Sequence, residues 1–277
     1  MSQKNFKMRI VSIENDFLKS LLEKENFSFF PHQYAFFRAQ KDKITLILYK
    51  NQTLLLQGEE IFVDKYTDFI RQYLTTDEIE GETLGLDESG KGDIFGPLVL
   101  AGVIVKEHKK EIVKAGIDDS KKLSDERIKE IFSSLQNKII YKARVIEPEE
   151  YNRLYEHYKN LNELMTDEYK KLILSFDDDL YKKIILDKYS LSKKQILKLK
   201  SGLTRNIEIY PKAERNLVVA LASIVARYHF IRWFEVQKID FLKGSGEEAV
   251  KLYKMLKKSL PQEDLSKIAK LHFKLKI

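Results

Sequence analysis

Four acidic residues stand where strands are predicted to end or a helix to begin, and their side chains could hold metal ions. Asp87 and Glu88 follow one short apolar run, Asp187 follows a second run, and Glu214 comes shortly after a third. Strand ends meet in one crevice of an open α/β sheet, so these four side chains could converge although they lie far apart in the chain.

Carboxylates gathered in one cleft would need cations. Two carboxylates 4 Å apart repel each other by roughly 4 kcal/mol at an effective dielectric constant of about 20. Ligands that are all oxygen favour Mg²⁺ or Mn²⁺ over zinc. Two such ions about 3.5–4 Å apart can activate a water molecule and stabilise the leaving oxygen when a phosphodiester is cleaved. The four acids therefore fit a metal-dependent hydrolase.

Simpler explanations exist for each acid taken alone. A strand-end carboxylate is usually just solvated, and Glu214 could complement the dipole of a helix that begins nearby. Asp87 and Glu88 are adjacent, and neighbouring side chains of a strand point to opposite faces. Both can serve one site only if the chain twists sharply there, and Gly90 and Gly92 would permit a tight turn just beyond.

Two short segments could contact phosphate or sugar groups. In Ser89-Gly90-Lys91-Gly92, backbone amides could approach such a group while Lys91 supplies a positive charge. Ser120 and Lys121, in a charged segment before a predicted helix, offer a hydroxyl and an ammonium group. The first pattern is more often a plain turn, and the second is more often a solvated one.

Composition and charge narrow the class of protein. The chain has 277 residues, of which 43% are hydrophobic, so it can bury a sizeable core. It has no cysteine, which excludes a disulfide scaffold, a thiolate zinc site and a cysteine nucleophile, and suits a reducing compartment. Residues 1–80 carry 11 basic and 12 acidic side chains, and the remainder carries 38 and 30. The excess of basic residues after residue 80 is consistent with a polyanionic binding partner. It is equally consistent with a lysine-rich surface that is simply solvated.

The chain shows no membrane signal. Its N-terminus lacks the apolar region of a signal peptide. The longest nearly pure apolar run, residues 217–226, is about half the roughly 20 residues that a membrane span requires. We expect a cytoplasmic protein with no membrane association, and a monomer by default.

The elements that would position these residues fall into two units. We predict a small α/β unit over residues 1–76, a polar linker over 77–82 and a larger α/β unit over 83–277. In the first unit, hydrophobic periodicity predicts two helices around four strands. The predicted helices are 15–24 and 61–74, and the predicted strands are 27–30, 34–38, 44–49 and 53–57.

The second unit reads as a sheet with helices between its strands. Apolar runs predict five strands, and residues 216–234 are apolar on nearly all sides, as in a core helix. The strands are 83–86, 98–105, 138–145, 183–186 and 207–210; the other helices are 124–136, most of 149–175, 246–259 and 263–272.

Several motifs, in the right order, resemble the type 2 ribonuclease H superfamily, and most closely ribonuclease HIII. The opening strand–turn–strand of that family is similar to residues 86–93 and 95–99, and its Asp-Ser-Lys-Lys-Leu motif matches residues 119–123. Asp187-Lys188-Tyr189 falls where the family has its third acid. The fourth-acid motif and its helix resemble residues 212–214 and 222–228, and the closing segment resembles residues 269–273.

The resemblance implies a ribonuclease H-like fold, a mixed five-stranded sheet flanked by helices. It implies endonucleolytic hydrolysis of the RNA strand of an RNA–DNA hybrid duplex, which leaves 5′-phosphate and 3′-hydroxyl ends. Asp87, Glu88, Asp187 and Glu214 would hold two Mg²⁺ or Mn²⁺ ions. The segment Ser89–Gly92 would lie against the substrate near the scissile bond, where the 2′-hydroxyl distinguishes RNA from DNA. Ser120, Lys121 and Lys212 would contact phosphates, whereas His229 and His272 receive no role.

Three features favour ribonuclease HIII over HII. The HII family usually has Asp where this chain has Glu214, and Arg where it has Lys91. An N-terminal domain of this size resembles the half of a TATA-binding protein found in HIII, where it helps to bind the hybrid. Its near-neutral charge is a departure from a strongly basic binding platform.

Other functions remain as alternatives. A ribonuclease HII would incise efficiently at a single ribonucleotide within DNA. A non-catalytic hybrid-binding protein would use only the excess of basic residues after residue 80, and would not need the four acids. Another two-metal nuclease on the same fold, such as a junction resolvase, is disfavoured by the Lys-Ala-Glu and Asp-Ser-Lys-Lys-Leu segments.

Overall fold

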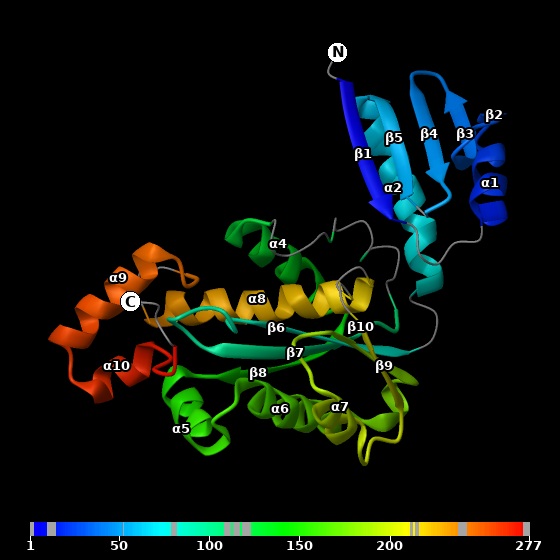
Figure 1. The fold of residues 1–277 in the computed structure, drawn as a ribbon. Helices are drawn as coiled ribbons and strands as arrows, with labels where there is room; N and C mark the ends of the chain where they lie inside the picture. Colours follow the sequence, from blue (N-terminus) through cyan, green and yellow to red (C-terminus); the bar gives the residue numbers. More distant parts are fainter. Residues whose placement is uncertain are drawn as a thin grey trace. The chain divides into compact units, whose positions relative to one another are not determined.

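The chain folds into two compact units, residues 1–78 and 79–277 (Figure 1). The computed structural model describes residues 3–9, 15–51, 53–78, 82–107, 112, 117, 123–210, 213, 216–237 and 243–273.

The first unit is a five-stranded antiparallel sheet with two helices. Its strand order is β1-β5-β4-β3-β2. Alternate residues of the strands are buried, as along β4, because only one face of the sheet packs against α1 and α2. The elements are β1 (Gln3–Arg9), α1 (Asn15–Lys24), β2 (Ser28–Phe30), β3 (Ala35–Lys41), β4 (Ile44–Tyr49), β5 (Thr53–Glu59) and α2 (Glu60–Glu78).

The two largest differences from the sequence prediction in this unit concern one strand and one helix. Strand β1 is absent from the predicted set because its residues are mostly polar; its seven residues are paired with β5, from Gln3 opposite Glu59 to Arg9 opposite Thr53. Helix α2 continues to Glu78, past the predicted end at residue 74 and into the predicted linker, since no Gly or Pro interrupts it.

The second unit is built on a mixed five-stranded sheet, as predicted. Its order is β10-β9-β6-β7-β8; β10, β9 and β6 run parallel, whereas β6, β7 and β8 are antiparallel neighbours. The strands are β6 (Thr83–Ser89), β7 (Leu98–Ile104), β8 (Ile140–Ile146), β9 (Lys183–Asp187) and β10 (Asn206–Tyr210).

Helices cover both faces of this sheet (Figure 1). One face packs against α8 (Leu217–Gln237) and α4 (Asp125–Leu135). The other packs against α5 (Pro148–Tyr158) and α6 (Leu161–Ser175), with α7 (Lys193–Lys200) beside α6. By length and composition α8 could cross a membrane, but most of it is buried in the unit, as expected of a core helix. The chain ends with α9 (Glu247–Ser259) and α10 (Gln262–Ile268).

Two predicted helical stretches in this unit have other bounds than expected, and one helix is additional. The helical stretch 149–175 is two helices, because Lys159 adopts a left-handed φ of 53° and Asn160 caps the next helix. Helix α10 ends at Ile268, since Ala269 leaves the helix and forms a β-bridge with Phe95. Helix α7 was not predicted; a capping box at Ser192 starts it.

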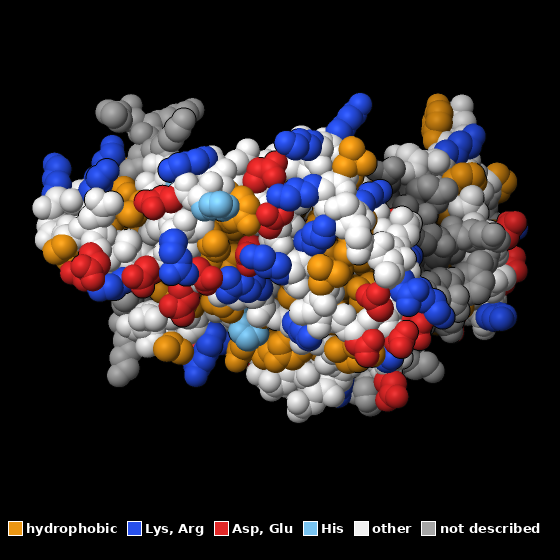
Figure 2. All heavy atoms as spheres, turned by 90° about the horizontal axis from the view of Figure 1, so that it is seen from below, with side chains coloured by type: hydrophobic (Ala, Val, Ile, Leu, Met, Phe, Trp, Pro, Cys, Tyr) orange, Lys and Arg blue, Asp and Glu red, His pale blue; other side chains and the backbone are white. Residues whose placement is uncertain are grey.

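Acidic and basic side chains are interspersed over the face of the molecule that includes α5, α6 and α7, with small hydrophobic patches between them (Figure 2). Ion pairs join these helices to their neighbours: Lys198 on α7 contacts Asp167 on α6, and Arg144 on β8 contacts the buried Glu168. Much of the charge on this face is therefore paired within the fold.

Candidate active site

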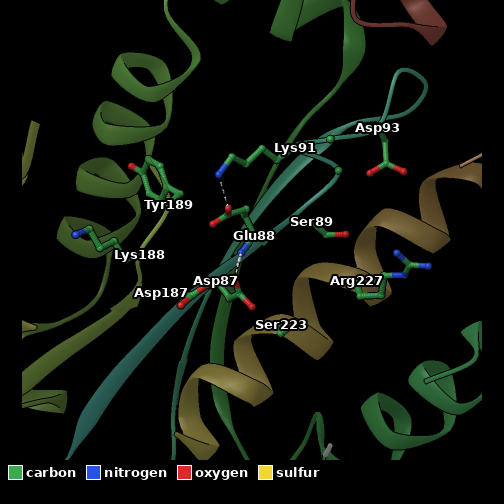
Figure 3. A pocket seen from close by; sticks show the side chains of 12 residues that line it. Asp87, Glu88, Ser89, Lys91, Asp93, Asp187, Lys188, Tyr189, Ser223 and Arg227 are labelled. Carbon is green, nitrogen blue, oxygen red and sulfur yellow. Dashed lines mark hydrogen bonds and ion pairs between the residues drawn. The ribbon is translucent and has the colours of Figure 1, made fainter. Parts of the chain in front are cut away.

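The register of two parallel strands brings two of the four acids together. Leu86 of β6 lies opposite Leu186 of β9, so the next residues, Asp87 and Asp187, are neighbours where the pairing of these two strands ends (Figure 3). Adjacent strands lie about 4.8 Å apart. Sequence positions a hundred residues apart thus place their carboxylates in one crevice.

Asp87 and Glu88 both line this crevice, and they do so from a regularly paired part of strand β6. Strand β6 keeps its pairing with β7 through Ser89, so the two side chains do point to opposite faces. Asp87 accepts a hydrogen bond from Ser223 of α8, and Glu88 accepts one from Tyr169 of α6, at 2.5 Å. Because the pairing of β6 with β9 ends at Leu86, both faces open into one cavity.

This cavity has a volume of about 400 Å³ and is polar. It includes seven of the predicted site residues, and five that were not assigned from the sequence. Of these five, Ser223 and Arg227 are four residues apart in α8, so they lie on the same side of the helix. Both fall in residues 222–228, which resemble the family, and this spacing is the sequence signal that could have identified them as site residues. The lining residues are Asp87, Glu88, Ser89, Gly90, Lys91, Gly92, Asp93, Asp187, Lys188, Tyr189, Ser223 and Arg227.

The environment of Asp87 suits a bound cation. Protein surrounds its carboxylate on most sides, and this desolvation, followed by the negative charge of Glu88, raises the pKa of Asp87 well above its usual value. Asp187 adds a further negative charge that raises it. A divalent cation would relieve this repulsion, and the donors are all oxygen, as Mg²⁺ and Mn²⁺ prefer.

Glu88 is held between a phenol and an ammonium group. The Tyr169 hydroxyl donates to Oε2, and Lys91 Nζ lies 3.3 Å from Oε1. Tyr169 is fully buried and stacks on Tyr189, over whose ring Lys91 also lies, 4.7 Å from the centroid. Nothing in the local sequence marks Tyr169, because it lies on α6, far along the chain from Glu88.

The three acids share the cavity but do not form a closed cluster. Among the residues with described side chains, no three His, Cys, Asp or Glu groups are drawn together closely enough to hold a metal ion. Glu88 is turned toward Tyr169 and Lys91, as Figure 3 shows for Lys91. The fourth predicted acid, Glu214, lies outside the described residues, as do Ser120, Lys121 and Lys212.

Asp187 is fixed by a residue next to Glu214. Its Oδ1 accepts a hydrogen bond of 2.9 Å from the backbone N–H of Ala213, which is fully buried. Ala213 packs with Ile185 of β9 and Val219 of α8. The carboxylate of Asp187 is therefore oriented by the segment that joins β10 to α8.

The two glycines around Lys91 play different parts. Gly90 has a φ of +82°, and a Cβ there would lie 2.1 Å from the carbonyl oxygen of Pro97, so the turn itself requires glycine. A Cβ on Gly92 would meet no atom within 4 Å. Because the fold does not demand glycine at Gly92, its bare backbone leaves room for a group entering the cavity.

Comparison with known proteins identifies the family to which the chain belongs. The family model of ribonuclease HII matches residues 84–276. The chain belongs to the ribonuclease HII and HIII family. Ribonuclease HIII of Protochlamydia amoebophila is 34% identical over 91% of this chain and 89% of its own length. The family establishes the chain as an endoribonuclease, a hydrolase of phosphodiester bonds.

Solved structures of the family share this fold. The crystal structure of Aquifex aeolicus ribonuclease H3 matches with a TM-score of 0.58 and 30% identity, over 96% of this chain and 98% of that one. The structure of Bst ribonuclease HIII in complex with Mn²⁺ matches with a TM-score of 0.67 over 98% and 96% of the two chains. At 22% identity the second match supports the fold alone.

The two histidines left without a role lie outside the cavity lining. His229 packs against the rings of Phe132 and Tyr228, and burial lowers its pKa. His272 contacts the Tyr151 hydroxyl at 3.2 Å. Burial, followed by the charge of Lys270, lowers the pKa of His272 to about 4.

We expect His272 to make the folded state sensitive to acid. The folded protein keeps this imidazole neutral, whereas the unfolded chain takes up a proton below about pH 6.5. The free energy of unfolding should therefore fall as pH drops from about 6.5 toward 4. The upper limit is about 1.4 kcal/mol per pH unit, and the actual loss should be smaller because the ring is partly exposed. Urea unfolding at pH 7.5 and 5.5 should show a smaller loss for H272Q than for the wild type. Equal losses in H272Q and in the control H157Q would contradict this assignment.

Proposed function

We propose that this chain is a ribonuclease HIII that hydrolyses the RNA strand of RNA–DNA hybrids, leaving 5′-phosphate and 3′-hydroxyl ends. The observation that carries the proposal is the register that sets Asp87 beside Asp187 at the mouth of a polar cavity. Glu88 enters the same cavity from the opposite face of β6, so acids converge on a volume where a phosphodiester could lie.

Two Mg²⁺ or Mn²⁺ ions are the proposed cofactors, held by Asp87, Glu88, Asp187 and Glu214. When bound, such ions activate the attacking water and stabilise the leaving oxygen. The protein's part is to orient the ligands: Tyr169 fixes Glu88, and the Ala213 amide fixes Asp187. Glu214 directly follows Ala213 in the chain, which is consistent with its place in this set.

The segment Ser89-Gly90-Lys91-Gly92 is the proposed contact to the hybrid near the scissile bond. It lines the cavity, and the open space at Gly92 allows a sugar or phosphate to approach the backbone. Lys91 could exchange its contact with Glu88 for a phosphate when substrate arrives. Ser120, Lys121 and Lys212 are further proposed phosphate contacts, from their types and their place in the family motifs.

The first unit is proposed to be a binding platform resembling half of a TATA-binding protein. Its sheet has one face free of its own helices, where alternate residues of β3 and β4 stay partly or fully exposed. These include an aromatic residue and a cation, Phe36 and Arg38, which could pack on sugars and contact phosphates. We further propose a monomer that works in the cytoplasm.

Deleting residues 1–80 should weaken hybrid binding more than it slows the bound chemical step. We expect the dissociation constant to rise by about tenfold or more, because phosphate contacts supply much of nucleic-acid affinity, while single-turnover cleavage at saturating protein stays within about threefold. Fluorescence anisotropy with a labelled hybrid, in Ca²⁺ to prevent turnover, measures the first quantity. Unchanged binding by the truncated protein would refute the platform role.

The substrate assay separates the proposed function from its alternatives. A labelled all-RNA/DNA hybrid and a DNA duplex containing one ribonucleotide are incubated with the protein and Mg²⁺ or Mn²⁺. We expect efficient cleavage of the hybrid at several positions and poor incision of the single-ribonucleotide duplex. The reverse preference would make the chain a ribonuclease HII in function, and tight hybrid binding without cleavage in either metal would make it a non-catalytic binding protein.

A further inference from the structure

Lys270 has an ionisable side chain that is fully buried, close behind the turn that follows Gly90-Lys91-Gly92. Its Nζ donates to the backbone carbonyls of Asp93, at 3.0 Å, and Gly96, at 2.7 Å, and lies 5.6 Å from the centre of the Tyr151 ring. Burial lowers the pKa of Lys270 to about 7. An ammonium group removed from water without a contacting carboxylate is costly, and such groups are enriched at functional sites.

The backbone around Lys270 is paired with the same turn. Its N–H donates to the carbonyl of Ile94 at 2.8 Å, and the N–H of Gly96 donates to the carbonyl of Ile268 at 3.0 Å. The β-bridge between Phe95 and Ala269 lies between these two bonds. The segment after α10 is therefore hydrogen-bonded to residues 93–96 through both its main chain and the buried Nζ of Lys270.

Residues 269–271 of this segment are themselves hydrogen-bonded to α5. The Asn152 amide donates to the carbonyl of Ala269 at 2.8 Å, and its Oδ1 accepts from the N–H of Leu271 at 2.8 Å. On the other side of the turn, Gly244 donates to Asp93 Oδ1 at 2.6 Å and accepts from the N–H of Ile94 at 3.1 Å. The turn is thus bonded from two separate parts of the chain.

In this arrangement the position of the first residues of the turn, 90–92, depends on the position of the residues that follow them, 93–96. The turn leaves β6 at Ser89 and enters β7 at Leu98, and Gly90, Lys91 and Gly92 lie between Ser89 and the bonded residues. The N–H of Asp93 donates to the carbonyl of Gly90, which transmits the position of Asp93 to the glycine segment. Movement of residues 93–96 would therefore displace the backbone that lines the cavity.

We propose that Lys270 is a positioning residue for substrate, which clamps residues 93–96 and so holds Gly90-Lys91-Gly92 in place at the mouth of the cavity. The proposal rests on the proposed function, since it assigns the glycine segment a role in binding the hybrid. A methionine could fill the same space without a buried charge. The carbonyl groups of Asp93 and Gly96 need hydrogen-bond donors, which Lys270 Nζ supplies. The K270M variant has no such donors, so both carbonyl groups would lose these hydrogen bonds.

The test compares the full-length wild type with K270M and a matched control, K267M. Lys267 lies on α10 and is exposed, and among the residues described its ion pairs are with Asp264 and Glu263. Hydrogen exchange without substrate should be about tenfold faster in K270M at the amides of residues 90–96 and unchanged elsewhere in the second unit. The KM for a labelled hybrid should rise about tenfold while kcat stays within about threefold, and K267M should match the wild type.

Other results would overturn the clamp. Exchange at residues 90–96 and KM both unchanged in K270M would refute it, and so would faster exchange spread evenly over the second unit with KM unchanged. K270Q keeps one donor group and should give intermediate values of both quantities. If K270M does not fold, N152A loosens the same segment from the α5 side and should raise KM about threefold; an unchanged KM in N152A would then refute the proposal.

The two hypotheses fail differently. Exchange is measured without substrate and tests the clamp whatever the protein cleaves. A wild type that leaves hybrids intact would refute the proposed function, whereas a wild type that cleaves them, beside a K270M variant with the same KM, would refute only the role of Lys270.

Discussion

D187N should cleave an RNA–DNA hybrid about a thousandfold more slowly than the wild type, which corresponds to about 4 kcal/mol in the activation barrier. The substitution removes one negative charge and one strong oxygen donor from the cavity in which Asp87 and Glu88 also lie. Its amide keeps an oxygen that can still accept the hydrogen bond from the Ala213 N–H, so the fold around it should be preserved.

Single-turnover cleavage in Mg²⁺ gives the rate, and anisotropy with the same labelled hybrid gives the binding constant. Binding should survive in D187N within about threefold, because phosphate and sugar contacts supply most of the affinity. D264N is the matched control, since Asp264 is an exposed residue on α10 that is not among the residues lining the cavity, and it should behave as the wild type. A D187N rate within tenfold of the wild type would reject the carboxylate site.

Removal of divalent cations should abolish cleavage. We expect protein treated with EDTA to leave a labelled hybrid intact, and Mg²⁺ or Mn²⁺ added in excess to restore cleavage, because the carboxylates that line the cavity need a counter-charge before a phosphodiester can enter. Cleavage that persists in EDTA would exclude the proposed chemistry, even if the family fold is correct.

The same cations should stabilise the protein without substrate. Mn²⁺ binds the folded site and so raises the melting temperature. Protons compete for the same oxygens, and burial and the charge of Glu88 raise the pKa of Asp87, so the apparent Mn²⁺ affinity should weaken as pH falls, and should do so at a higher pH than an ordinary carboxylate would require. D187N should lose most of the Mn²⁺-dependent shift in melting temperature, whereas D264N should keep it; a full shift in D187N would place the ions elsewhere.

The elements that could be predicted are those whose signals are local. Helix α1 and strand β4 have the bounds expected from periodicity, and the helix predicted from residue 124 has Ser124 as its N-cap, with its side chain accepting from the Arg127 N–H. Helix α8 is apolar all round, and it is the core helix of the second unit. In each case, neighbouring residues carry the whole signal.

Other elements depend on partners far along the chain. Strand β1 has a polar sequence, and its place in the sheet comes from its pairing with β5. The bounds of α10 change for the same reason, since pairing with Phe95 takes Ala269 out of the helix. Local propensity cannot anticipate these contacts, because tertiary packing overrides it.

The sequence alone determined which residue types could do the chemistry and that their motifs resemble one family of nucleases. The tertiary structure decided that Asp87 lies beside Asp187, that Tyr169 holds Glu88, and that Lys270 supports the glycine turn. The physical reason is that side-chain types and short periodicities are properties of neighbouring residues, whereas strand register and buried hydrogen bonds join residues that meet only when the sheet and its helices assemble.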